Sequence, residues 1–429
     1  MSTRRLLVIG GAGPSALSID ACRRALLQGR ALGLRVTLTA VSAGAPEIRA
    51  LEDAADELVE TDLRDPGQRR AFLDGRDYDL VFGVRDAMQI AVAETAEALG
   101  APGNPVAAVR RAVTKDLARA RLREAGLAQP DVALCHGPAD ALAFLERTAG
   151  PWVVKPRSAT GSLGVTRLTG AGGLAEALGR LPDPAEFLVE TFVPGEEYSV
   201  EGVFLDGRPV VLACTAKRKL EGPGFVETGH ALPAALPSAD ERRLTEEVGR
   251  ALLALGLCSG VFHVEAWLDK DSVVVGETHT RVGGDWIHSM VEWTRPGTGL
   301  FGLAYADMLD ERPPALRPVR RGAAAVYLTP PPGRVRAVDG WLEASSAPEV
   351  LHAELAVGAG GTVPACRSSG DRVGVIVAGA PSGTKEAESS ARRLCASVVF
   401  TLRDGSRHDG LGRRLPPSDS STPTGLESC

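Results

Sequence analysis

The chain has 429 residues, of which 44% are hydrophobic, and a formal net charge of −6 at pH 7. A chain of this length is expected to fold into two to four lobes, and its acidic balance argues against nucleic-acid binding. No apolar run is long enough to span a bilayer, so no membrane partner is expected. The seven cysteines are scattered without Cys-x-x-Cys spacing, which favours reduced thiols in a cytoplasmic protein.

The first predicted lobe, residues 1–105, alternates strands with helices, which predicts an α/β unit with a parallel sheet. Strands are expected over residues 5–9, 35–41 and 78–82, and helices over residues 15–32 and 87–99. A glycine turn, Gly10 to Gly13, follows the first strand. The third glycine of a dinucleotide fingerprint is missing, so a tight turn or a substrate contact is favoured over a cofactor site.

Residues 106–191 are predicted to hold a linker helix, over residues 106–125, and a small lid. The lid is expected to contain strands over residues 150–156, from 165 and over 186–190, with a helix over 174–179. Lys155 leads directly into a loop of small residues that includes Ser158, Gly161 and Ser162. Backbone N–H groups of such a loop can wrap a triphosphate while the lysine neutralises it. The residue order of a Walker loop is absent, so a flexible hairpin turn is the alternative.

The central lobe, residues 192–310, is predicted to contain two antiparallel hairpins and a helix over residues 292–309. The first hairpin pairs 197–205 with 209–215 and turns at Asp206-Gly207. Lys217 and Lys219 come directly after it, and only six of the 48 basic residues are lysines. Lys217 could face a phosphate or an anionic substrate, and a solvated charge run is the alternative.

The second hairpin pairs residues 261–268 with 273–279, and it carries the most informative pattern in the chain. Side chains alternate faces along a strand, so two glutamates, Glu265 and Glu277, are expected on one face as close diagonal neighbours. Two adjacent carboxylates repel, so a positive charge is expected between them. Oxygen ligands suit Mg²⁺ or Mn²⁺, and Arg281 could hold a phosphoryl or carboxylate oxygen. A surface hairpin with scattered charges is the alternative.

A C-terminal α/β lobe is predicted over residues 311–403, with strands over 323–328 and 372–378. The tail, residues 404–429, is rich in Ser, Pro, Gly and Arg and is predicted to be disordered.

Taken in order, these parts resemble the ATP-grasp superfamily of carboxylate–amine ligases. The resemblance rests on Lys115, on Lys155 with its glycine loop, on the segment 188–201, and on Glu265 followed by the Glu277-x-His-x-Arg281 motif. It covers residues 1–402 and is strongest over residues 113–287. The C-terminal lobe, with segments 327–333 and 371–376, looks most like the L-amino-acid ligases. The implied fold is α/β with an α+β lid and a central antiparallel sheet.

The resemblance implies a role for each matching residue. Contacts to ATP are implied for Lys115, Lys155, Ser158, Gly161, Ser162, Glu190, Phe192, Val193 and Glu197. In this set Glu190 would accept from the adenine amino group and Glu197 would bind the ribose. Metal ligation is implied for Glu265 and Glu277, and reaction roles are implied for Arg281, Lys155 and His230. Gly283, Gly284 and Trp286 are expected at the substrate pocket, although core packing is as plausible for Trp286.

His279 departs from the superfamily pattern, which usually has Asn two residues after the second glutamate. Its ring nitrogen could bind a metal or could only hydrogen-bond a neighbouring group. His263 could line the metal face or serve as a core partner, and His230 could lie near the acceptor substrate.

The function implied is ATP-dependent activation of a carboxylate, followed by amide formation with an amine. ATP and Mg²⁺, or Mn²⁺, are the expected cofactors, and amino acids are the expected substrates. A homodimer is considered, with no nucleic-acid partner. Formyl transfer in purine-type metabolism, aminoacylation of a carrier protein and a nucleotide-binding regulator without turnover are the alternatives.

Overall fold

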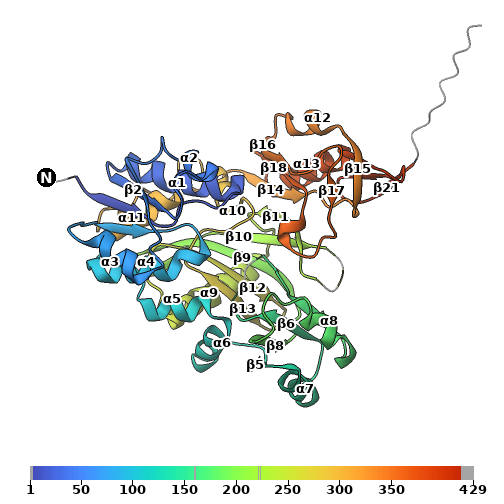
Figure 1. The fold of residues 1–429 in the computed structure, drawn as a ribbon, viewed down its shortest axis with the longest axis horizontal. Helices are drawn as coiled ribbons and strands as arrows, with labels where there is room; N and C mark the ends of the chain where they lie inside the picture. The colour runs from blue at the N-terminus through green and yellow to red at the C-terminus, as the bar shows by residue number, and fades with distance from the viewer. Residues whose placement is uncertain (1–2, 159–160, 221, 223, 417–429) are drawn as a thin grey trace, which may run out of the picture.

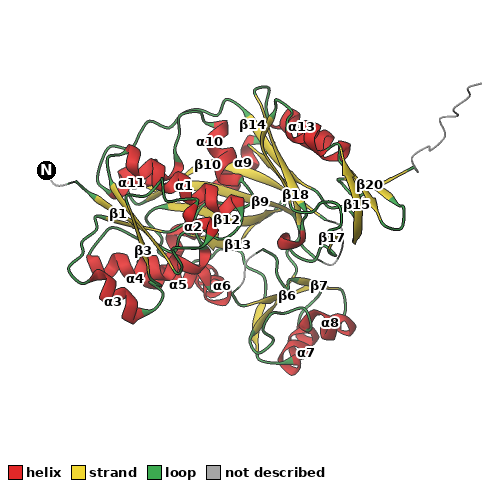
Figure 2. Cartoon of the chain, turned by 45° about the horizontal axis from the view of Figure 1, so that its top comes forward, coloured by secondary structure: helices red, strands yellow, loops and turns green. Residues whose placement is uncertain are grey.

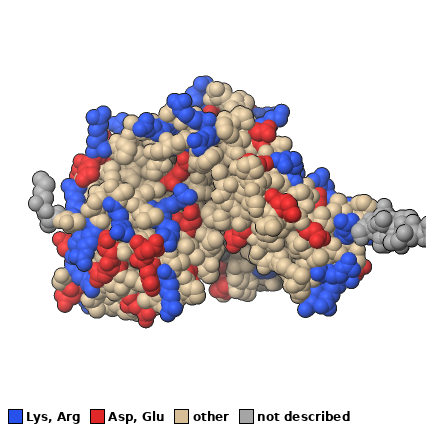
Figure 3. Space-filling model, turned by 90° about the horizontal axis from the view of Figure 1, so that it is seen from above, with Lys and Arg blue, Asp and Glu red and all other residues tan. Residues whose placement is uncertain are grey.

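The computed structural model describes residues 3–158, 161–220, 222 and 224–416. Figure 1 shows an N-terminal lobe with helices on both faces of its sheet, a long central sheet, a small lid and a C-terminal part that continues from the central sheet. On the face seen in Figure 3, basic and acidic side chains are interspersed. Among the described residues, no helix is long and apolar enough to cross a membrane.

The N-terminal lobe is the predicted parallel α/β unit. Its four-stranded sheet has the order β3-β2-β1-β4, with all pairs parallel. Its elements are β1 (Arg5–Val8), α1 (Ala16–Ala31), β2 (Arg35–Ala40), α2 (Pro46–Arg49), β3 (Glu57–Glu60), α3 (Pro66–Leu73), β4 (Leu80–Phe82), η1 (Asp86–Met88) and α4 (Gln89–Leu99). The turn after β1 has positive φ at Gly10 and Gly11, and Arg85 Nη1 donates to Gly10 O at 3.1 Å. The carboxyl ends of β1 and β4 therefore lie side by side, which places η1 at the edge where parallel sheets usually bind ligands.

The predicted linker helix is interrupted. The structure has α5 (Val106–Val113) and α6 (Lys115–Glu124), separated by Thr114 in an extended conformation with φ −104° and ψ 106°. Lys115 N donates to Arg157 O of the lid loop at 3.4 Å. The break therefore ties the start of α6 to the lid, and it brings Lys115 to the inside of the molecule, where it is 9% exposed.

The lid contains the predicted β-β-α-β unit, and it adds a strand and a helix that the sequence interpretation missed. Its antiparallel sheet has the order β5-β8-β6-β7. The elements are β5 (Val132–Cys135), α7 (Pro138–Arg147), β6 (Trp152–Pro156), β7 (Thr166–Leu168), η2 (Ala171–Gly173), α8 (Leu174–Leu178) and β8 (Phe187–Thr191). Phe144, Val154 and Phe187 are buried in a separate lid core, so the lid is packed as a unit of its own (Figure 2).

The central and C-terminal lobes share one sheet of eight strands, in the order β13-β12-β9-β10-β11-β14-β18-β16. The central elements are β9 (Glu196–Leu205), β10 (Arg208–Lys219), β11 (Glu227–Leu232), α9 (Ser238–Leu255), β12 (Val261–Leu268), β13 (Val273–His279), α10 (Ile287–Thr294) and α11 (Leu300–Met308). The predicted turn at Asp206-Gly207 has positive φ at both residues, as a tight hairpin requires. The single helix expected over residues 292–309 is instead the pair α10 and α11.

The predicted boundary at residue 311 divides this sheet, because β14 pairs with β11 along Gly229↔Val326 to Leu232↔Ala323. Pairing covers an edge that would otherwise expose unbonded backbone groups. The C-terminal elements are β14 (Gly322–Tyr327), β15 (Gly333–Asp339), α12 (Trp341–Ser345), β16 (Val350–Leu355), β17 (Thr362–Val363), η3 (Ser369–Asp371), β18 (Gly374–Ala380), α13 (Thr384–Ser397), β19 (Val399–Leu402), β20 (Arg407–Asp409) and β21 (Arg414–Leu415).

The prediction of disorder from residue 404 is wrong for residues 404–416. The strands β20 and β21 extend a second sheet by pairing with β19 and with each other. Asp409 is 4% exposed, and its Oδ1 accepts from Leu411 N and Arg413 N at 3.0 and 2.8 Å. These local bonds fix a turn that composition alone does not reveal. The rest of the predicted tail, residues 417–429, lies outside the described residues.

Candidate functional site

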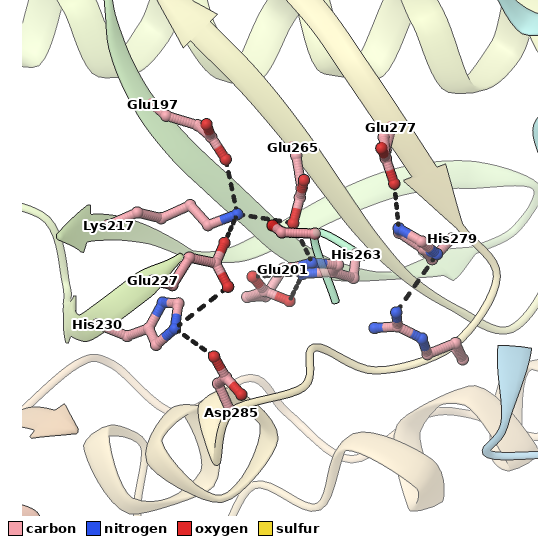
Figure 4. Close-up of polar contacts among 12 residues, drawn as sticks. Glu197, Glu201, Lys217, Glu227, His230, His263, Glu265, Glu277, His279 and Asp285 are labelled. Carbon is pink, nitrogen blue, oxygen red and sulfur yellow. Dashed lines mark hydrogen bonds and ion pairs between the residues drawn. The ribbon is translucent and has the colours of Figure 1, made fainter. Parts of the chain in front are cut away.

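The hairpin β12–β13 forms one wall of a cavity between the lid and the central sheet. Glu265 pairs directly with Glu277 in the register, and His263 pairs with His279. The two glutamates are therefore opposite each other and not diagonal as predicted, and a register shift follows Glu265. Both carboxylates line the cavity, together with His279 and Arg281. The expectation that the sequence pattern brings these charges to one face is confirmed (Figure 4).

Each glutamate has its own lysine. Lys217 Nζ lies 2.6 Å from Glu265 Oε1, and Lys115 Nζ lies 3.4 Å from Glu277 Oε1. Burial alone would raise the pKa of Glu277, but the Lys115 ammonium and a hydrogen bond from His279 lower it to about 2. The pKa of Glu265 is likewise held well below its ordinary value, against burial, by Lys217 and His263. Both carboxylates are thus ionised at neutral pH.

The Lys217 ammonium lies at the centre of three carboxylates. Besides Glu265 it contacts Glu197 Oε1 at 2.7 Å and Glu227 Oε1 at 2.5 Å, and its side chain is only 1% exposed. Burial would lower its pKa, but these three carboxylates raise it well above the ordinary value. The reading of Lys217 as part of a solvated charge run is therefore wrong, because β10 turns this side chain inward while Arg218 points outward at 50% side-chain exposure.

An aspartate of the N-terminal lobe holds the other end of the hairpin. Asp86 Oδ1 lies 2.8 Å from Nδ1 of His279, and its Oδ2 accepts from Arg281 Nη2 at 2.8 Å. With Nδ1 facing Asp86, the Nε2 atom of His279 lies 3.6 Å from Glu277 Oε2. A carboxylate behind an imidazole in this way fixes the ring and its tautomer. Burial would raise the pKa of Asp86, but Arg281 and His279 hold it far below its ordinary value.

The lid contributes a buried ion cluster to the opposite end of the cavity. Glu190, on β8, accepts from Arg119 Nε at 2.9 Å and lies 2.8 Å from Lys155 Nζ. These side chains are 5%, 2% and 6% exposed. Burial would raise the pKa of Glu190, but Arg119 and Lys155 lower it to about 2. Burial lowers the pKa of Lys155, which Glu190 partly offsets.

Aromatic rings close this end. Phe192 and Phe225 lie with ring centroids 6.5 Å apart and nearly parallel, and both line the cavity. Lys219 Nζ lies 5.3 Å from the Phe225 ring centroid, and it also contacts Glu197. The rim thus combines apolar faces with a carboxylate, the surroundings that a nucleoside requires.

A third group of charges lies at the junction with the C-terminal lobe. His230 Nε2 lies 2.8 Å from Asp285 Oδ2 and 3.9 Å from Glu227 Oε2. Glu227 lines the cavity, whereas His230 and Asp285 lie behind it. Trp286 stacks on His352 with centroids 3.6 Å apart and faces a different groove, beside α1 and α10.

Two family models match this chain. The model of the ATP-grasp domain matches residues 148–289, which include the lid, β12 and β13. The model of L-amino acid ligase C-terminal domain 2 matches residues 326–403. The chain contains an ATP-grasp domain. Its C-terminal part, from the end of β14 to β19, is similar to the L-amino acid ligase C-terminal domain 2.

The L-amino acid ligase from Bacillus licheniformis has a similar solved structure, with a TM-score of 0.77 and 25% identity over 94% of this chain and 100% of that one. Carnosine synthase 1 of Homo sapiens is 27% identical over 50% of this chain and 29% of its own length. Alanine–anticapsin ligase of Bacillus subtilis is 27% identical over 42% of this chain and 43% of its own length. The chain thus spans less than half the length of these two curated relatives.

Twelve of the residues expected from the sequence line one cavity. They are Lys115, Lys155, Gly161, Ser162, Glu190, Phe192, Val193, Glu197, Glu265, Glu277, His279 and Arg281. Five expected residues are not among the lining residues: Ser158, His230, Gly283, Gly284 and Trp286. Ser158 is exposed. At Gly283 a Cβ atom would lie 2.9 Å from Glu201 Oε2, so this glycine leaves room for the carboxylate that binds His263 at 2.9 Å.

The sequence interpretation missed three charged residues of the site: Asp86, Arg119 and Glu227. Asp86 follows the strand β4 at the carboxyl edge of a parallel sheet, a position that often carries functional side chains. The scarcity of lysine in the chain singled out Lys217 as a candidate, but its three carboxylate partners were not predicted. No comparable signal marks Arg119 among the many arginines.

Proposed function

We propose that the protein is an ATP-dependent ligase that activates the carboxylate of an amino acid as an acyl phosphate and couples it to an amine, with release of ADP and phosphate. The observation that carries this proposal is the alignment of charges along one cavity. Lys115, Lys155, Glu265, Glu277 and Arg281 all line it. Lys155 pairs with Glu190 of the lid, and Arg281 pairs with Asp86 of the N-terminal lobe. The L-amino acid ligase domain at the C-terminus supports an amino acid as the carboxylate substrate.

In this proposal the ATP phosphates contact Lys115, Lys155 and the loop of Gly161 and Ser162. The adenine ring lies against Phe192, with its amino group toward Glu190 and the backbone of Val193 at the ring edge, and Glu197 binds the ribose. Glu190 and Glu197 are already ion-paired, so these pairs hold the two acceptors in place before the nucleotide arrives. Such preorganisation reduces the cost of ordering on binding.

A divalent cation fits the middle of the cavity. Two ionised carboxylates face it from adjacent strands, and Nε2 of His279 is turned toward Glu277. Glu265, Glu277 and His279 would hold the ion, which when bound neutralises charge on the transferring phosphoryl group. Among the described residues, Glu265 forms a compact cluster of ligand atoms with Glu197 and Glu227, around Lys217, and not with Glu277 and His279. Binding of Mg²⁺ would therefore exchange lysine contacts for metal contacts.

In this proposal Arg281 and Asp86 neutralise charge and position the reacting groups. The carboxylate attacks the γ-phosphate, and Arg281 holds the transferring group, fixed in turn by Asp86. The amine then attacks the acyl carbon and phosphate leaves. Lid closure would exclude water, which competes with the amine for the acyl phosphate.

The test is to measure ADP and phosphate release from ATP and Mg²⁺ with panels of single and paired amino acids, and to identify products by mass spectrometry. Release that requires two amino acids and yields a dipeptide mass is the expected result. ATP binding without turnover across the panel would contradict amino-acid ligation. It would favour a nucleotide-binding regulator or an enzyme that aminoacylates a carrier protein.

A further inference from the structure

One side chain of the C-terminal domain reaches the candidate site. Arg372, which follows η3, donates from Nη1 and Nη2 to the two carboxylate oxygens of Asp285, at 2.7 Å each. Its guanidinium carbon lies 3.5 Å from the centroid of the Tyr327 ring, and the side chain is 7% exposed. A bidentate, stacked and buried arginine is strongly oriented. Arg372 therefore fixes the position of Asp285.

The backbone at Asp285 needs such support. Asp285 and the following Trp286 have φ of 52° and 65°, a left-handed conformation that is costly for residues other than glycine. Strained residues of this kind persist where their surroundings hold them, and they concentrate at functional sites. This turn comes four residues after Arg281, so its position affects the end of the cavity where the acyl group would lie.

Arg372 also reaches the wall of the cavity on this side by two routes. Its Nη1 donates to the backbone oxygen of Glu227 at 3.0 Å. Through Asp285 it holds His230, whose Nε2 lies between the carboxylates of Asp285 and Glu227 (Figure 4). Glu227 is the member of this set that lines the cavity. The arginine therefore controls both the backbone and the side-chain surroundings of Glu227.

The turn that precedes Arg372, at residues 368–371, contacts the lid loop. Ser369 N donates to the backbone oxygen of Gly161, in the glycine loop, at 3.2 Å, and Arg372 Nε donates to Ser369 O at 2.7 Å. A capping box between Ser368 and Asp371 stabilises the turn. One short segment of the C-terminal domain thus joins the lid loop to Asp285.

We propose that Arg372 is a positioning residue that couples closure of the lid to the arrangement of Glu227 and His230 at the reaction end of the cavity. This inference rests on the proposed ligase function. When the coupling is lost, the lid still binds ATP, but the reaction end is not sealed or ordered. Water then attacks the acyl carbon in place of the amine, the C–O bond to phosphate breaks, and the products are the original carboxylate and inorganic phosphate.

The test compares phosphate release with amide formation in wild type, Arg372→Gln and Arg372→Lys, using the amino-acid pair that the wild type couples best. The wild type is expected to release one phosphate per amide. In Arg372→Gln we expect amide formation to fall about 10- to 100-fold, as for other lost positioning contacts, with ATP affinity within about twofold and a several-fold higher ratio of phosphate to amide. Lysine cannot make the bidentate contact, so Arg372→Lys should resemble Arg372→Gln.

The matched control is Arg393→Gln, which removes an exposed ion pair with Glu349 in the same domain and should leave the ratio unchanged. Asp285→Asn should raise the ratio as Arg372→Gln does, and the double variant should add little, because both act through one contact. A ratio of one in Arg372→Gln, whether or not the rate falls, would overturn the proposal.

A second measurement does not depend on ligase activity. With a non-hydrolysable ATP analogue bound, limited proteolysis at Arg157 and within residues 161–164 should be several-fold faster in Arg372→Gln than in wild type, while the thermal unfolding profile stays similar. Equal cleavage rates would overturn the link to the lid. If the wild type forms no amide with any pair, the ligase function fails, and the proteolysis result still decides whether Arg372 communicates with the lid.

Discussion

The two ends of the cavity are built in different ways. At the nucleotide end, Lys115, Arg119, Lys155, Glu190 and Phe192 come from one continuous stretch of less than eighty residues that contains the lid, and the neighbouring Glu197, Lys219 and Phe225 complete it. At the reaction end, Asp86 comes from the N-terminal lobe, Arg281 from the central lobe and Arg372 from the C-terminal domain. The nucleotide end can therefore be recognised as a local motif, whereas the reaction end exists only once three lobes are assembled.

This difference suggests that the two ends of the cavity determine different properties, nucleotide binding at one and substrate choice at the other. A nucleotide end made mainly from a single stretch can remain the same among proteins that use the same nucleotide. A reaction end assembled from three lobes can change its substrate through substitutions in any of them. Function at the first end should depend on few residues, and function at the second on contacts between lobes.

The largest effect is expected where the two ends meet. Replacing Glu277 with Gln removes a charge that Lys115 and His279 hold ionised and that a metal would require. We expect turnover to fall about a thousandfold or more, in line with the loss of a group that stabilises transferring charge, while the thermal midpoint changes little. The assay is ADP release at saturating ATP and Mg²⁺.

The control for this substitution is Asp271→Asn, in the exposed turn of the same hairpin, where the side chain is 80% exposed. Near-normal turnover in a folded Glu277→Gln protein would show that the hairpin carboxylates do not take part in the reaction.

At the reaction end, Asp86→Asn should lower turnover about 10- to 100-fold, the usual cost of removing the carboxylate that orients a functional side chain. Asparagine keeps the shape but cannot balance the charge of Arg281 or hold Nδ1 of His279 as an ionised partner does. ATP affinity, measured by calorimetry, should stay within about twofold because the nucleotide end is untouched. Asp77→Asn, in an exposed loop of the same lobe, is the control. A loss of ATP affinity as large as the loss of turnover would contradict the separation of the two ends.

The accuracy of the sequence interpretation follows the same division. Strand alternation and turn residues predicted the hairpin of Glu265 and Glu277, because these signals lie within twenty residues. Nothing local predicts that β14 adds to β11, since the pairing of two strands nearly a hundred residues apart depends on the assembled sheet edge. The partners of Arg281 and Asp285 were missed for the same reason. Arg372 is one of many arginines, and only its stacking on Tyr327 and its burial distinguish it.

At the nucleotide end, Lys155→Met should weaken ATP binding about 10- to 100-fold, since it removes a buried ammonium that faces the cavity and one charge-assisted contact contributes on the order of 1.5 to 3 kcal/mol. Amide formation at saturating ATP should fall less than affinity does. Lys155→Arg keeps the positive charge but places the wider guanidinium group in the same buried position. Its ATP affinity therefore shows whether the charge alone is sufficient. Lys270→Met, 82% exposed, is the control. Unchanged affinity in Lys155→Met would remove the phosphate role from this lysine.

The smallest effect concerns stability and pH. The pKa of Glu190 is lowered from 4.5 to about 2 because Arg119 and Lys155 outweigh the effect of burial. A group whose pKa is lower in the folded protein stabilises the fold above its unfolded value, and this stabilisation is lost as the pH falls toward the folded value. Wild type should therefore exceed Glu190→Gln in thermal midpoint by several degrees at pH 7, and the gap should narrow steadily between about pH 5 and pH 3. Part of the gap will persist, because glutamine leaves two buried cations without an anion at every pH. A gap that stays constant over this range would mean that Glu190 is not ionised in the folded lid, and the nucleotide end would then lack the fixed carboxylate on which its preorganisation depends.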